Sequence, residues 1–308
     1  MSLGAGSIAP AQLASLRERY PRAFARTPLQ RSVLAASLLA LVAFVVFCLY
    51  RFDATPARVI NGLDRFGKIA GALFPPTPGE AFWDLVWAMA ETVGMAFLGT
   101  LIASIIAVPL GFMGARNVLS IWLFRFPIRR SFDFLRGVDA LVWALVYVRA
   151  VGLGPLAGVL AIATTDIGIL SKLFAEAIEN VDRKQVDGVQ ATGASTVQRL
   201  RFGIIPQVLP IMISNALYMF ESNTRSATIL GIVGAGGIGF HLSDRIRAHR
   251  WEEVGFIILM IIVVVAVIDF VSHFLRSRLI KAGGDRPLML QPETERPQTS
   301  TMTHAVRG

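Results

Sequence analysis

The chain has 308 residues, of which 54% are hydrophobic and 17% are charged, against about 25% charged residues in an ordinary soluble domain. The formal net charge is +9, but the basic residues lie where membrane topology places them, which argues against a nucleic-acid-binding protein. A single cysteine, Cys48, excludes an intrachain disulfide.

Apolar residues are gathered into runs that are long enough to cross a membrane. A helix needs about 20 apolar residues for this, because it rises about 1.5 Å per residue. Two weaker runs, about Phe132–Val148 and Ile204–Thr224, accompany four strong ones. The strong runs are Val33–Tyr50, Thr92–Ala115, Val151–Leu170 and Val254–Leu275. The sequence therefore predicts an all-α polytopic membrane protein with about six transmembrane helices.

The basic residues favour an orientation with both termini in the cytoplasm. In that orientation 21 of the 30 Lys and Arg residues lie in cytoplasmic segments, as the positive-inside rule requires. Arg245, Arg247 and Arg250 are the exception, because they fall outside. The predicted order is a cytoplasmic segment (1–31), a peripheral transmembrane helix (32–50), an external connection (51–88), a core (89–280) with a cytoplasmic loop (176–210), and a disordered cytoplasmic tail (281–308).

Two glycine motifs match nucleotide-binding signatures in part, and we reject both. Residues 62–69 fit the first seven positions of a P-loop, but Ile69 stands where Ser or Thr must hold magnesium. Residues 234–239 fit G-x-G-x-x-G, but a membrane span follows instead of the second strand of a dinucleotide fold. The four histidines show no metal-ligand spacing. We therefore expect no enzymatic activity and no bound cofactor or metal on this chain.

The loop at 176–210 mixes small, charged and apolar residues. Val181–Val189 and Thr196–Phe202 are predicted to form two short helices. Gly193 permits a sharp turn between them, and Ser195 is a candidate cap for the second helix. Small residues in this loop would let a partner surface approach closely. The alternative is an ordinary amphipathic loop that lies on the membrane.

This loop resembles the cytoplasmic loop of bacterial ABC-importer permeases, written E-A-A, three residues, G, nine residues, I-x-L-P. Aligned on Gly193, the signature places E-A-A at 187–189 and I-x-L-P at 203–206. Asp187, Gly188 and Pro206 keep the character of the signature, whereas Val189, Gly203 and Ile205 depart from it. The resemblance assigns contact with a separate ATPase to Asp187, Gly188, Ala191, Thr192, Gly193, Ala194, Ser195 and Pro206.

Longer strings around the loop resemble the phosphonate-uptake permeases in order and spacing. Examples are KLFAEAIENVD (172–182) and RSATILGIVGAGGIG (225–239), and the resemblance covers about residues 80–280. It implies an ABC-importer type I permease core of about five helices, with 32–50 as an added N-terminal helix. It also implies a homodimer in the bacterial inner membrane, two separate ATP-binding subunits that carry ATP and Mg, and an extracytoplasmic solute-binding protein.

The cargo that the resemblance implies is phosphonate or a related phosphorus oxyanion, such as phosphate or phosphite. The alternative is a secondary transporter or channel for a small anion, which works without an ATPase.

Ionisable residues inside the predicted spans are functional candidates, because each costs about 3 kcal/mol on insertion scales. They are Glu91, Asp139, Arg149, Asp166, Glu221, Arg225 and Asp269. An oxyanion pathway needs donors such as arginine, whose fork matches phosphate oxygens. The candidates for lining the pathway are Arg149, Glu221, Asn223, Arg225, Ser226, Gly234, Gly236 and Gly237.

Each group of candidates has an alternative role. Glu221 and Arg225, spaced i,i+4, share a helix face and can pair with each other to hold the bundle together. Arg149 lies near the outer end of its span, where its side chain can snorkel to the surface. The glycine-rich run 231–239 is expected to break the helix, either as a turn that lines the pore or as a loosely packed external loop.

Overall fold

The computed structural model describes residues 28–118 and 121–282. Within these ranges every regular element is a helix, which confirms the all-α fold class. The chain divides into two compact units, Met1–Ala72 and Leu73–Gly308, and each is described by itself. The predicted cytoplasmic N-terminal segment and the predicted disordered tail lie almost wholly outside the described residues.

The first unit contains two helices. α3 (Pro28–Arg51) includes a 20-residue apolar stretch long enough to cross a membrane, and none of that stretch is buried in protein. It confirms the helix predicted at Val33–Tyr50. α4 (Pro56–Ala72) lies within the expected external connection, where no helix was expected.

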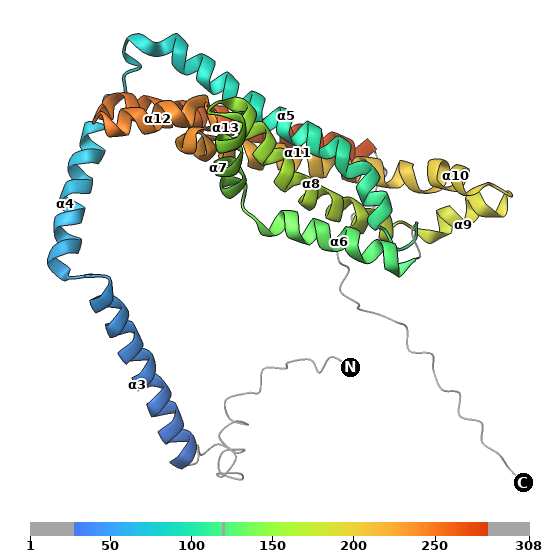
Figure 1. Cartoon of the computed structure of the whole chain (residues 1–308), viewed down its shortest axis with the longest axis horizontal. Helices are drawn as coiled ribbons and strands as arrows, with labels where there is room; N and C mark the ends of the chain where they lie inside the picture. Colours follow the sequence, from blue (N-terminus) through green and yellow to red (C-terminus); the bar gives the residue numbers. More distant parts are fainter. Residues whose placement is uncertain (1–27, 119–120, 283–308) are drawn as a thin grey trace, which may run out of the picture. The chain divides into compact units, whose positions relative to one another are not determined.

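The second unit is a bundle built on four long helices, α5 (Phe82–Gly114), α8 (Pro155–Glu179), α11 (Ile205–Leu230) and α13 (Trp251–Ala282). α8 packs against α5 and α11, and α11 packs against α13. One end of the bundle, the loop end, carries α9 (Arg183–Ala191) and α10 (Thr196–Arg199) (Figure 1). The opposite end, the glycine end, carries α7 (Ala140–Val151) and α12 (Gly237–Arg247) (Figure 1).

Among the described residues, five helical stretches are long and apolar enough to cross a membrane. They are Ser32–Arg51, Gly79–Gly114, Pro155–Glu179, Thr196–Ala235 and Trp251–Arg278. These stretches agree with five of the predicted spans and confirm the polytopic fold class.

The sixth predicted span, Phe132–Val148, is wrong as a single helix. α6 (Trp122–Gly137) ends before Val138, whose backbone is extended, and α7 begins after Asp139. The Asp139 carboxylate accepts a 2.8 Å hydrogen bond from the Leu141 N–H and so caps α7. With 12 residues, α7 is too short to cross the hydrocarbon core alone.

The contact between α5 and α8 depends on small residues. Gly99, Ala103, Ala107 and Gly111 recur every four residues along α5, and all four are buried. A methyl group added at Gly111 would lie 2.7 Å from Phe174 Cβ on α8. In lipid, helices gain little from the hydrophobic effect, and close van der Waals packing through small residues drives their association.

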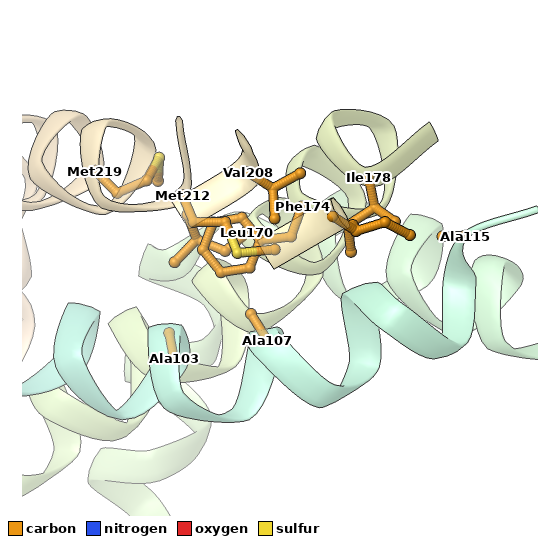
Figure 2. Close-up of a cluster of buried hydrophobic side chains, with 10 residues drawn as sticks. Ala103, Ala107, Ala115, Leu170, Phe174, Ile178, Val208, Met212 and Met219 are labelled. Carbon is orange, nitrogen blue, oxygen red and sulfur yellow. The ribbon is translucent and has the colours of Figure 1, made fainter. Parts of the chain in front are cut away.

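An apolar core fills the space between α5, α8 and α11 (Figure 2). Ala103 and Ala107 of α5 face larger side chains from the other two helices, among them Phe174, which is 1% exposed. The labelled members of the core are Ala103, Ala107, Ala115, Leu170, Phe174, Ile178, Val208, Met212 and Met219. The small residues of α5 thus leave room for the large ones of its neighbours.

Gly111→Ala is expected to destabilise the bundle. Alanine has a higher helix propensity than glycine by about 1 kcal/mol, but here its methyl group would overlap Phe174, and overpacking costs about 1–3 kcal/mol. We expect a lower melting temperature for the purified protein in detergent. The control is Gly94→Ala on the same helix, where no heavy atom lies within 4 Å of the added methyl group. Equal melting temperatures for the two variants would contradict the close packing.

Candidate functional site

Helices α9 and α10 are each capped at the start by the side chain of the residue that precedes them. The Asp182 carboxylate accepts a 3.0 Å hydrogen bond from the Lys184 N–H at the start of α9. At the start of α10, the Ser195 hydroxyl accepts from the Gln198 N–H, and the Gln198 side chain accepts from the Ser195 N–H at 2.8 Å. Gly193 joins the two helices with a φ of +80°. The predicted turn at Gly193 and the predicted cap at Ser195 are confirmed.

A surface pocket lies between α9 and α10. Of the residues expected to contact an ATPase, Gly188, Thr192, Gly193 and Ala194 line this pocket. Asp187, Ala191 and Ser195 are exposed on or next to the same two helices. Pro206 lies apart from them, in the first turn of α11. The lining residues are Gln185, Gly188, Val189, Thr192, Gly193, Ala194, Gln198 and Phe202. A methyl group at Gly188 would meet no heavy atom within 4 Å, so a partner has free access to the backbone of α9 at this point.

Gln207, in the first turn of α11, holds α9 in place, although no sequence pattern singled it out. Its amide oxygen accepts a 2.9 Å hydrogen bond from the Asp182 N–H, and its amide nitrogen donates to the Gly203 carbonyl at 2.6 Å. Gly203 lies in a π-helical turn (Leu200–Ile204), where an added methyl group would come within 3.3 Å of Val186 Cα on α9. A displacement of α9 therefore acts directly on α11.

Glu179, at the end of α8, anchors the other side of the loop. Its Oε1 atom accepts hydrogen bonds from Arg129 Nη2 of α6 at 2.5 Å and from the Arg116 N–H at 2.7 Å. The Asn117 side chain donates to the Ile178 carbonyl at 2.6 Å. The last turn of α8 is thus joined both to α6 and to the segment that follows α5.

Farther along the bundle, the charged residues of α11 form ion pairs with α13. Arg225 Nη1 donates to Asp269 Oδ1 at 3.2 Å, and Arg225 Nη2 lies 3.7 Å from Glu221 Oε1. Glu221 Oε2 accepts a 2.6 Å hydrogen bond from Arg276. This geometry favours the pairing alternative for Glu221 and Arg225. The side chain of Arg225 nevertheless remains 48% exposed, and its role in a pathway stays a prediction.

Asn223 lies on another face of α11, the one that contacts α5 and α8. Its amide nitrogen donates to Asp166 Oδ2 at 2.5 Å and to Thr100 Oγ1 at 2.8 Å. Asp166 is 2% exposed, and the three side chains satisfy one another in the interior, where an unpaired polar group is costly. Ser226 donates to the Ser222 carbonyl of its own helix at 3.3 Å. The cluster of Thr100, Asp166 and Asn223 ties three helices together at one level.

The glycine-rich run breaks the helix after α11, as predicted. A π-helical turn (Gly231–Ala235) follows Leu230, and Gly234 and Gly236 have φ values of +101° and +79°. α12 then crosses back over α11 at very short range. A methyl group added at Gly239 of α12 would overlap the backbone carbonyl of Thr228 on α11, and one added at Gly231 of the turn would lie 2.8 Å from Gly239 Cα. The run is therefore a packed turn, and its loosely packed alternative is wrong.

The start of α12 is held by two residues of α5. The Glu91 carboxylate accepts a 3.2 Å hydrogen bond from the Gly237 N–H, and the Thr92 hydroxyl accepts a 2.8 Å hydrogen bond from the Ile238 N–H. The first N–H groups of a helix have no partner within it, and they carry a partial positive charge. Glu91, a candidate from its place within a span, thus has a structural partner.

Arg149 lies in the last turn of α7, at the glycine end. It is exposed and has no ion pair or side-chain hydrogen bond among the described residues. The turn that follows it contacts the glycine run, because the Gly154 N–H donates to the Gly234 carbonyl at 3.0 Å. The structure therefore brings the helix of Arg149 to the glycine run, while Arg225 is engaged with Asp269 farther along α11.

Two of the three basic residues that fell on the unexpected side have an acidic partner. Arg245 Nε lies 3.3 Å from Glu253 Oε2, and Arg250 also pairs with Glu253. Arg245 also contacts His241, whose pKa is lowered by burial and by the positive charge of Arg245. Arg245 and Arg250 thus have a local partner, but they still count against the predicted orientation, because the positive-inside rule counts Lys and Arg rather than net charge.

Comparison with known proteins identifies the class. Residues 107–282 match the family described as binding-protein-dependent transport system inner membrane component, and the chain belongs to this family. The putative phosphite transport system permease protein HtxC of Stutzerimonas stutzeri is 40% identical over 251 residues, which cover 81% of this chain and 86% of that protein. The phosphate-import permease protein PhnE of Mycolicibacterium smegmatis is 38% identical over 208 residues, 68% of this chain and 39% of that longer protein.

The fold agrees with this class. A chain from an inward-facing structure of the MetNI methionine ABC transporter superposes with a TM-score of 0.58 at 18% identity. The match covers 66% of this chain and 99% of that chain. The second unit therefore has the fold of an ABC-importer permease, as predicted.

Gln207→Ala is expected to loosen α9 without unfolding the bundle. The variant loses two hydrogen bonds to the loop, and one hydrogen bond of about 1 kcal/mol corresponds to roughly five-fold faster local opening. Amide hydrogen exchange of the full-length protein should therefore be faster across residues 182–191. Gln185→Ala, on the exposed surface of α9, is the matched control. Unchanged exchange in Gln207→Ala would show that the tether does not hold the loop.

Arg225→Gln and Asp269→Asn are expected to lower the melting temperature by similar amounts. Each change breaks the Arg225–Asp269 ion pair, and Arg225→Gln also loses the longer contact with Glu221, so the double variant should be no less stable than Arg225→Gln alone. The effect should be modest, about 1 kcal/mol at most, because both side chains are partly exposed. Arg149→Gln is the control, and it should leave the melting temperature unchanged. If Asp269→Asn were neutral in stability and transport while Arg225→Gln abolished transport, Arg225 would belong to the pathway.

Proposed function

We propose that this chain forms, as a homodimer, the translocation pathway of an ATP-driven importer for phosphonate or a related phosphorus oxyanion. Two separate ATP-binding subunits dock on the 176–210 loop and carry ATP and Mg, while this chain binds no cofactor. An extracytoplasmic solute-binding protein delivers the cargo. The observation that carries the proposal is the pocket between α9 and α10, which is joined on both sides to helices of the bundle.

The pocket suits a docking surface that transmits movement. Its lining includes glycine, alanine and threonine beside the exposed ring of Phe202, so that a partner can approach the backbone and bury an aromatic side chain. A displacement of α9 would be transmitted to α11 through the hydrogen bond of Gln207. A displacement of the end of α8, which precedes α9, would be transmitted to α6 through Glu179.

The cargo is proposed from the relatives and from the charges of the glycine end. Two relatives of nearly equal identity are named for phosphite and for phosphate, which supports the class of phosphorus oxyanions without separating its members. Arg149 is an exposed cation on the helix that leads into the glycine run, and it forms no ion pair among the described residues, so it is the first candidate to meet such an anion. Arg225 is a second candidate if Asp269 releases it.

The orientation is proposed with both termini in the cytoplasm. The loop end carries more basic residues than the glycine end. They are Arg116, Arg129, Arg183, Lys184, Arg199 and Arg201, against Arg149, Arg245, Arg247 and Arg250. The positive-inside rule, which counts Lys and Arg rather than net charge, therefore supports a cytoplasmic loop end. There the ATP-binding subunits have access to α9 and α10.

The test is ATP hydrolysis by the complex reconstituted with its ATP-binding and solute-binding subunits in proteoliposomes. We expect stimulation by at least one member of a panel containing phosphonate, phosphite, hypophosphite and phosphate, and none by this chain alone. No stimulation across the panel would overturn the cargo. Uptake by vesicles that contain this chain without the ATP-binding subunits would instead support a secondary transporter or channel.

Docking is tested in the same complex with a glycine substitution. Gly193→Val places a β-branched residue at a φ of +80°, a conformation that such residues rarely adopt. We expect loss of co-purification with the ATP-binding subunit, or ATP hydrolysis that no longer responds to cargo. Gly94→Ala, on α5 and outside the loop, adds a methyl group that meets no neighbouring atom and is the control. Full coupling in Gly193→Val would contradict the docking role of this turn.

A further inference from the structure

The link between α3 and α4 is short and ordered. The Ala54 N–H donates to the Leu49 carbonyl at 2.9 Å, and the Val59 N–H donates to the Thr55 carbonyl at 3.1 Å. The Thr55 hydroxyl accepts from the Arg58 N–H at 3.3 Å at the start of α4. Only residues 52–55 separate the two helices. α4 therefore begins close to the point at which the membrane-crossing stretch of α3 ends.

The sequence of α4 places its apolar and polar residues on opposite faces. Val59, Leu63, Phe66 and Ala70 follow one another at the four- and three-residue spacing of a single helix face. The opposite face carries Arg58, Asn61, Asp64, Arg65 and Lys68. The helix is thus amphipathic over its whole length of 17 residues, with an excess of basic over acidic residues on the polar face.

Within the first unit, the apolar face of α4 has no protein partner among the described residues. No side chain of α4 is buried, and Val59, Leu63 and Phe66 are 55%, 65% and 69% exposed. Such a stripe of exposed apolar area in water is unfavourable at about 25 cal/mol per Å². A folded chain therefore needs something to cover this face.

Two observations identify what covers it. The apolar stretch of α3 ends at Arg51, a few residues before α4 begins, so that the surface of a membrane crossed by α3 lies next to the start of α4. The polar face carries Arg58, Arg65 and Lys68, of which Arg65 has no carboxylate within ion-pair distance among the described residues. An anionic lipid bilayer matches both faces of α4, because its acyl chains can cover the apolar face and its charged headgroups can bind the basic residues of the polar face.

We propose that α4 lies in the plane of the membrane interface as an amphipathic helix that binds anionic phospholipid. Its apolar face enters the boundary between headgroups and acyl chains. Arg58, Arg65 and Lys68 contact lipid phosphates, either directly or by reaching up to them along their apolar stems. The helix thereby fixes the end of α3 at the surface of the bilayer. This role is independent of the cargo and of the ATP-binding subunits.

The test measures the depth of α4 in the full-length protein. In a Cys48→Ser background, which removes the single native cysteine, a nitroxide is attached to Leu63→Cys or Phe66→Cys on the apolar face and to Asn61→Cys on the polar face. The protein is reconstituted in vesicles of phosphatidylcholine with phosphatidylglycerol. We expect the labels at 63 and 66 to collide with oxygen more than with a water-soluble nickel chelate. The label at 61 should show the reverse order.

The contribution of charge is tested with the combined Arg58→Gln, Arg65→Gln and Lys68→Gln variant. In vesicles with phosphatidylglycerol, we expect its label at 63 to become shallower than that of the parent protein. The difference between these vesicles and pure phosphatidylcholine vesicles should be lost. A parent protein whose label depth is the same in both lipids would overturn the role of anionic lipid.

Two other outcomes overturn the proposal as a whole. Free access of the nickel chelate to labels 61, 63 and 66 alike would place α4 in water. Labels at 63 and 66 that are shielded from both oxygen and nickel would show that protein covers the apolar face, either a second copy of the chain or another part of the same one. A pulsed distance measurement between labels at 63 in two copies separates these two cases.

Discussion

The bundle depends on the close approach of α5 to α8. In lipid, two apolar helices gain little by leaving their neighbours, so association requires many short contacts. The stripe that includes Gly99 and Gly111 allows them, and a single added methyl group at either position would collide with α8. The same approach brings Thr100 next to Asp166, which Asn223 of α11 then joins. The position of the third helix therefore follows from the packing of the first two.

The short helices at the two ends of the bundle are attached to the long helices in different ways. At the loop end, side chains attach a solvent-exposed pair of short helices to the long ones, with Gln207 and Glu179 as the two attachments. At the glycine end Gly239 lets the backbone of α12 approach that of α11, and the side chains of Glu91 and Thr92 bind the start of α12. A movement of the loop end is thus passed to α6 and α11, and α11 runs into the turn that α7 contacts.

Local signals in the sequence predicted local structure well. Gly193 and Ser195 stand where a tight turn and a helix cap need them, so the short helices of the loop were predictable from residue type alone. The same reasoning failed between α6 and α7, where apolar residues on both sides of Asp139 were interpreted as one span. A mid-span carboxylate two residues after a glycine was the available signal for a helix start, and its capping role outweighed the apolar pattern.

The sequence by itself determined that the chain crosses a membrane several times, and it determined the family, because long apolar runs and ordered strings do not depend on how the chain packs. Only the tertiary structure decided which charges are engaged. The i,i+4 spacing of Glu221 and Arg225 was visible, but their bonds to Arg276 and Asp269 join residues more than 40 positions apart. Gln207 matched no signature and Gly203 departed from one, because the residues that they contact on and before α9 are brought to them by the fold. Which side chains pair across helices depends on how the helices pack, and helix packing cannot be predicted from a local stretch of sequence.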